Sequence, residues 1–127
     1  MAVRPTFTSG DVFTAVNANI LATSIVALNT QSGTAITAAL TDVGKLISFT
    51  SGTAVAFTIP ANATVAFSVG DQINIYQAGT ATVTITPAAT VTVRSSGAKL
   101  KTNDQYSIAT CIKIDTNEWI ALGNLKA

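Results

Sequence analysis

The chain of 127 residues contains no histidine and only one cysteine. Histidine is the commonest general base near neutral pH and the commonest metal ligand, so the usual starting point for acid–base catalysis or a transition-metal site is missing. A single cysteine cannot form an internal disulfide or a zinc site, and no histidine is present to activate it as a nucleophile. We therefore expect no enzymatic activity, no metal and no cofactor, and we expect Cys111 to be a small packing residue.

Charged residues are also scarce. Seven Lys or Arg and six Asp or Glu make up 10% of the chain, where about 25% is ordinary for a globular domain. The net charge is +1 and no basic run is present, which argues against a nucleic-acid partner because phosphate binding needs clustered cations. Hydroxyl and amide groups must solvate the surface in place of charges, or other protein chains must cover part of it. We expect both.

Long apolar runs are absent as well. No stretch approaches 18 consecutive apolar residues, so we expect no membrane-spanning helix and no membrane partner. The N-terminus lacks the charged start and apolar core of a signal peptide. These features predict a protein that is made in the cytosol.

Threonine and alanine are abundant, with 21 of each, and most of the chain alternates apolar and polar residues with a period of two. Thr80 to Thr86 is the clearest case, since Ala81, Val83 and Ile85 alternate with four threonines. The segments that read as strands are 34–37, 45–50, 55–59, 72–77, 80–86, 91–94, 106–114 and 119–122. We expect seven to nine strands and no fixed-period sequence repeat.

Turn signals between these segments favour hairpins. The expected hairpin connections are 51–53, 78–79 and 115–118. Short strands with turn signals about every 8–12 residues are typical of antiparallel all-β domains. The sequence thus predicts a mainly β fold: a single β-sandwich or jelly-roll-like domain at residues 30–127, with a barrel as the alternative.

Residues 1–29 differ from the rest. Met1 to Gly10 has no periodicity and reads as an extended arm. Thr14 is a good N-cap, and Val12, Val16 and Ile20 lie four residues apart, which predicts one short helix. We interpret residues 1–29 as an anchoring segment.

The acidic residues favour structural roles. Five aspartates lie in or beside predicted turns, where the carboxylate can accept hydrogen bonds from nearby backbone N–H groups: Asp11, Asp42, Asp71, Asp104 and Asp115. A carboxylate pair of Asp115 with Glu118 and a calcium site that adds Asn117 are weaker alternatives. Trp119 reads as a core residue that plugs the sheet edge; in the alternative of a carbohydrate-binding module, Trp119, Tyr76 or Tyr106 would supply a stacking platform.

A run of motifs resembles known virion proteins. Phe7-Thr8-Ser9-Gly10-Asp11-Val12-Phe13-Thr14-Ala15, followed by Asn19, is similar to the opening of many tailed-bacteriophage tail-fibre and minor tail proteins, although Phe13 stands where leucine is usual. Further matching pieces, similar to a β-rich domain of such proteins, are Asp42-Val43-Gly44-Lys45-Leu46, Ile59-Pro60, Val69-Gly70-Asp71-Gln72-Ile73, Leu100-Lys101, Gln105-Tyr106-Ser107, Ile112-Lys113 and Trp119 with Gly123-Asn124-Leu125.

This resemblance implies a virion structural protein, made in the host cytoplasm and commonly a homotrimer. No long shaft or second tip domain is recognisable, which favours a capsid decoration or cement protein docked on the major capsid protein. A tail-fibre or minor tail protein that contacts the host is the alternative, and a carbohydrate-binding module is a third. The candidate anchoring residues of the arm are Pro5, Phe7, Asp11, Val12 and Phe13.

Overall fold

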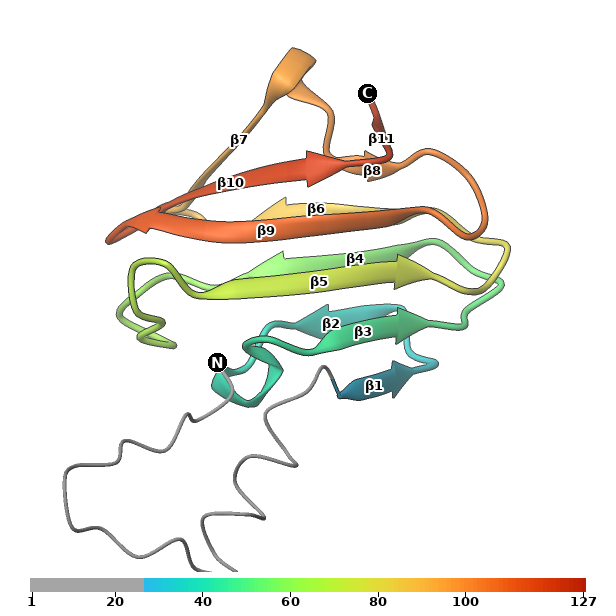
Figure 1. Ribbon diagram of the computed structural model, residues 1–127, viewed down its shortest axis with the longest axis horizontal. Coiled ribbons are helices and arrows are strands. Elements are labelled where there is room, and N and C mark those ends of the chain that lie inside the picture. The colour runs from blue at the N-terminus through green and yellow to red at the C-terminus, as the bar shows by residue number, and fades with distance from the viewer. Residues whose placement is uncertain (1–26) are drawn as a thin grey trace, which may run out of the picture.

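The computed structural model describes residues 27–127. The anchoring residues Pro5, Phe7, Asp11, Val12 and Phe13, and the helix predicted after Thr14, lie outside the described residues. Residues 27–127 form two β-sheets that face each other, with two short 3-10 turns and no α-helix (Figure 1). In this part of the chain, no helix has the length and apolar character needed to cross a membrane.

The strands are divided between a six-stranded and a five-stranded sheet, both mixed. In spatial order, the six-stranded sheet contains β1 (Leu28–Gln31), β3 (Leu46–Phe49), β5 (Gln72–Gln77), β9 (Ile108–Asp115), β10 (Glu118–Gly123) and β7 (Thr92–Ser95). The five-stranded sheet contains β11 (Leu125–Lys126), β8 (Lys101–Thr102), β6 (Val83–Pro87), β4 (Val55–Ile59) and β2 (Ala35–Thr37). The 3-10 turns are η1 (Leu40–Asp42) and η2 (Ser96–Ala98).

The first six strands form three stacked rungs, each with one strand in each sheet: β1 with β2, β3 with β4, and β5 with β6. Strands β1, β3 and β5 therefore pair in parallel in the six-stranded sheet, and β2, β4 and β6 do so in the five-stranded sheet. The connections from the six-stranded to the five-stranded sheet, residues 50–54 and 78–82, also stack on one another, and we call them arcs. The backbone N–H groups of Ala78 and Gly79 both donate to Phe49 O at 2.9 Å, and Ala81 N donates to Ser51 O at 3.3 Å.

Two of the three predicted hairpins are therefore wrong. Residues 51–53 and 78–79 carry the chain from one sheet to the other instead of reversing it within a sheet. The physical reason is the apolar character of both strands flanking each arc, which face each other across the core: Phe49 and Phe57 meet edge to face with ring centroids 5.6 Å apart. The third hairpin is confirmed, since β9 and β10 are antiparallel around residues 115–118.

The alternation predicted for 80–86 is confirmed in β6, although the strand begins later, at Val83. Val83 and Ile85 are buried, while Thr84 and Thr86 are half-buried on the outer face. Thr86 lies beside Thr58 of β4, which lies beside Thr37 of β2. The outer face of the five-stranded sheet is thus rich in small and hydroxyl side chains, as the composition indicates.

Candidate functional site

Three of the four aspartates in residues 27–127, Asp42, Asp71 and Asp115, accept hydrogen bonds from nearby backbone N–H groups, as predicted for turns, whereas Asp104 accepts one from a side-chain hydroxyl. Asp42 accepts hydrogen bonds from Ala39 N and from the Asn29 side chain, both at 2.8 Å. The other contacts are Ser68 N to Asp71 at 2.9 Å, Ser107 Oγ to Asp104 at 3.0 Å and Thr116 N to Asp115 at 2.7 Å. Asp11 lies outside the described residues. The carboxylates of the other four aspartates are therefore engaged in local structure.

The residues of the weaker alternatives also have other partners. Glu118 pairs with Arg94, and Asn117 Oδ1 accepts a hydrogen bond from Asn62 N at 2.8 Å. Within residues 27–127, no three His, Cys, Asp or Glu side chains gather where they could hold a metal ion. The arrangement does not favour a carboxylate pair or a calcium site at residues 115–118.

Cys111 and Trp119 are both core residues. Cys111 is fully buried, and this burial raises the pKa of its thiol from 9.0 to about 12. Trp119 is 1% exposed and packs edge to face on Phe67, with ring centroids 5.2 Å apart. Its strand β10 lies between β9 and β7, so the expected position at a sheet edge is wrong. A buried indole cannot serve as a carbohydrate platform; Tyr76 is half-buried and Tyr106 is exposed.

A buried lysine is the polar feature that the sequence did not reveal. Lys113 is 2% exposed, and its ammonium donates to Asn62 Oδ1 at 2.6 Å and to Phe67 O at 2.7 Å. Both acceptors belong to the segment that connects β4 to β5. Lys113 therefore fastens this connection to the core. The available signal was its parity with Cys111, which also points inward.

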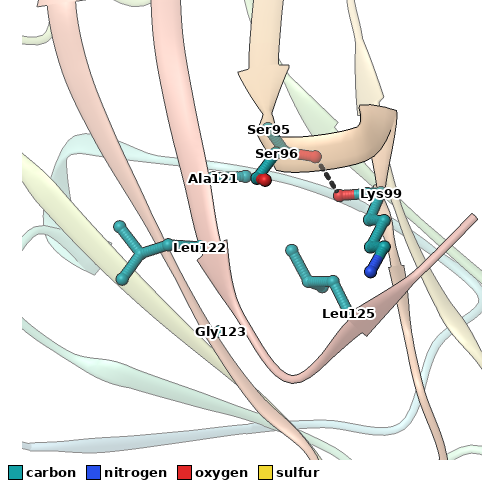
Figure 2. A pocket seen from close by; sticks show the side chains of 7 residues that line it. All are labelled: Ser95, Ser96, Lys99, Ala121, Leu122, Gly123 and Leu125. Carbon is teal, nitrogen blue, oxygen red and sulfur yellow. Dashed lines mark hydrogen bonds between the residues drawn. The ribbon is translucent and has the colours of Figure 1, made fainter.

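One hollow lies where β7 and η2 approach the end of β10 and β11 (Figure 2). It is lined by Ser95, Ser96, Lys99, Ala121, Leu122, Gly123 and Leu125. Its volume of about 190 Å³ is below the roughly 300–1,000 Å³ of typical ligand pockets. Lys99 is its one charged residue, and the Lys99 carbonyl accepts a hydrogen bond from Ser95 Oγ at 2.5 Å. The hollow is too small to enclose a drug-sized ligand.

The most unusual surface is the outer face of the six-stranded sheet, which carries large apolar side chains. The side chains that alternate with the buried residues of β9 and β10 point away from the core, and three of them are 42–52% exposed: Ile108, Ile114 and Leu122. Ile112 and Ile120 are half-buried beside them and lie directly opposite each other. We call these five residues the apolar outer face.

Some apolar side chains also lie on the outer side of the other strands of this sheet. Tyr76 of β5 lies beside Ile108, and one row of outward residues runs from β1 to β10 through Leu28, Leu46, Asn74, Thr110 and Leu122. The apolar members of this row belong to β1, β3 and β10, and Asn74 and Thr110 separate Leu46 from Leu122. Comparison of the chain with protein-family models, curated proteins and solved structures gave no match.

Proposed function

We propose that this protein is a non-enzymatic structural component of a bacteriophage virion, a homotrimer that docks on the major capsid protein and cements the shell. The observation that carries the proposal is the exposed apolar outer face, because contiguous apolar surface on a folded domain marks a site of contact with other protein chains. The resemblance of the N-terminal leader and of the motifs between Asp42 and Leu125 to phage virion proteins supports the viral context.

The distribution of polar groups supports a structural role. The charged groups that could perform chemistry hold turns and connections together, as Asp42, Asp71 and Lys113 do. Large apolar side chains are instead left on the surface, where they cost solubility in an isolated monomer. This arrangement suits a protein whose stability and position depend on association. In the cementing mechanism, the domain covers a junction between capsid subunits and adds buried apolar area there.

The proposal is tested by adding the purified protein to capsids that lack it, prepared from the virus whose genome encodes it. We expect saturable co-sedimentation with capsids and a rise in the temperature at which the shell disrupts. Deleting residues 1–11 should abolish incorporation while the β-domain keeps its circular dichroism spectrum, because the arm is the proposed anchor. Full occupancy by the truncated protein would refute the anchoring role of the arm.

Two other results would replace the proposal. Binding to purified tails and not to capsids would assign the protein to the tail-fibre or minor tail class. Affinity of the isolated domain for host polysaccharide, lost on substitution of Tyr106, would favour a carbohydrate-binding module.

A further inference from the structure

Strand β9 has an inverted pattern of side chains. Its inward residues are Ala109, Cys111 and Lys113, which are small or polar, whereas its outward residues include three isoleucines. A strand at the surface of a monomer normally places its large apolar side chains inward and its polar ones outward. Strands that are apolar on their outer side as well are typical of sheets covered on both faces. The pattern of β9 therefore indicates that the outer face of the six-stranded sheet is covered by other protein surface.

The outer face carries no unpaired charge across its central strands. The outward positions of β5, from Gln72 to Tyr76, and those of β9 before Asp115 are uncharged. At the margin, Glu118 of β10 already pairs with Arg94 of β7. A charged partner would find no complementary charge here, whereas an identical surface can meet this one without placing like charges together.

Three polar residues at the centre of this face, Gln72, Asn74 and Thr110, already have hydrogen-bond partners. Gln72 Nε2 donates to Asn74 Oδ1 at 2.9 Å, and Thr110 Oγ1 donates to the same oxygen at 2.8 Å. Asn74 Nδ2 donates to Lys45 O at 3.3 Å. Polar groups that are satisfied within the sheet can be covered by another chain at low cost, because burial does not leave these bonds unmade.

The size of the face suits one side of a protein interface. Six strands at a spacing of about 4.8 Å and a length of about 20 Å give a flat footprint of roughly 500 Å². Protruding side chains raise the accessible area above that footprint, toward the ~800 Å² that each partner contributes to a standard interface. Interfaces between copies of one chain are the more apolar class.

From these observations we propose that the outer face of the six-stranded sheet, centred on Ile108, Ile112, Ile120 and Leu122, is the contact between copies of this chain. The inference rests on the proposed function in its homo-oligomeric part and names the surface that joins the copies. Around the three-fold axis of a trimer, the apolar outer faces of the three copies point toward the axis, so each face contacts those of both neighbours.

The test uses charge complementation on the full chain. One double variant carries Ile108→Glu with Leu122→Glu, and a second carries Ile108→Lys with Leu122→Lys. Both sites are about half exposed, so the fold should tolerate the charges. The matched control is Ala35→Glu with Thr37→Glu, exposed on the outer face of the five-stranded sheet.

Sedimentation should show an oligomer for the wild type and for the control. Each double variant alone should be monomeric, with a self-association Kd raised about 100-fold or more, since a central interface residue contributes on that scale. Mixing the acidic and basic variants should restore part of the association, because opposite charges then meet at two of the three contacts of a mixed trimer. Unchanged Trp119 fluorescence verifies folding. If a double variant fails to fold, the single variants Leu122→Glu and Leu122→Lys are used instead.

Two results would overturn the inference: a folded wild-type monomer at micromolar concentration, or an oligomer that persists in both charged variants. Capsid binding separates this failure from failure of the proposed function. A monomer that still decorates capsids refutes the contact between copies alone. An oligomer that assembles through this face but binds neither capsids nor tails refutes the virion role alone.

Discussion

Replacing Gly79 with alanine should destabilise the domain, because two arcs of backbone meet closely at this residue. A Cβ atom at position 79 would stand 2.3 Å from Ser51 O and 2.6 Å from the Thr50 carbonyl carbon. Both are backbone atoms, so no side-chain rotation relieves the contact and the stacked arcs must separate. Gly79 does not adopt a left-handed conformation, so the predicted effect comes from the clash and not from backbone strain.

The magnitude follows from two contributions. Forcing extra volume into a packed site costs about 1–3 kcal/mol. Separating the arcs also weakens the hydrogen bonds that Ala78 N and Gly79 N donate to Phe49 O, each contributing about 0.5–1.5 kcal/mol. Alanine also lowers the conformational entropy of the unfolded chain, which stabilises the folded state by about 0.4–1 kcal/mol, too little to compensate. We expect a net loss of about 1–5 kcal/mol in the free energy of unfolding.

Gly52→Ala is the matched control, because Gly52 lies in the adjacent arc. Its Cβ would approach only Thr80 Oγ1, at an ordinary 3.8 Å, so the free energy of unfolding should stay level or rise by up to about 1 kcal/mol. Urea unfolding followed by the fluorescence of Trp119, the single tryptophan, measures both variants. Equal stability of the two variants would refute the close stacking of the arcs.

Three further predictions concern the core. Ile85→Ala should lower the free energy of unfolding by about 2–5 kcal/mol and Thr84→Ala by less than about 1 kcal/mol; equal losses in urea melts, with unchanged oligomer mass, would contradict the two faces of β6. Lys113→Met keeps the volume but leaves the side-chain carbonyl of Asn62 and the buried backbone carbonyl of Phe67 without their donor, so it should cost about 2–4 kcal/mol; unchanged protease resistance of residues 60–71 would argue against the fastening role. Because burial raises the pKa of Cys111 from 9.0 to about 12, the folded state favours the neutral thiol. This contribution is complete below pH 9 and is lost as the pH rises toward 12, by up to about 1.4 kcal/mol per pH unit, so Cys111→Ala should flatten the alkaline fall in stability; an identical fall in both proteins would exclude the thiol as its cause.

Strand positions and the inward residues of most strands could be predicted from the sequence. A period of two identifies which residues share a face, and β4 and β6 follow it with Val55, Phe57 and Ile85 inward. Turn residues also identified where the chain leaves a strand. Both features depend on residues close together in the sequence, which is why simple patterns suffice.

The parallel pairing could not be predicted in the same way, because a hairpin and an arc have similar local sequences. Both need small or polar residues between two strands, and Ser51-Gly52-Thr53 satisfies either. What separates them is whether the second strand pairs with the first or faces it across the core, which depends on distant residues. One signal was present: the arcs 50–54 and 78–82 have equal length and each ends before a buried valine, Val55 or Val83. The connections that lead back to the six-stranded sheet, residues 38–45 and 60–71, differ in length, so the structural repeat does not appear as a fixed period in the sequence.

The apolar outer face was concealed by a different ambiguity, which strand β9 shows clearly. In Ala109-Thr110-Cys111-Ile112-Lys113, hydrophobicity alone would place Ile112 inside and Lys113 outside, and the opposite occurs. Lysine can be inside because the connection at residues 60–71 supplies two oxygens for its ammonium. Isoleucine outside has no such partner within residues 27–127, and a covered side chain of this size contributes about 1.5–3 kcal/mol. The proposed contact between copies would cover this isoleucine, which is the physical reason for preferring that contact to a free monomer as the account of the register of β9.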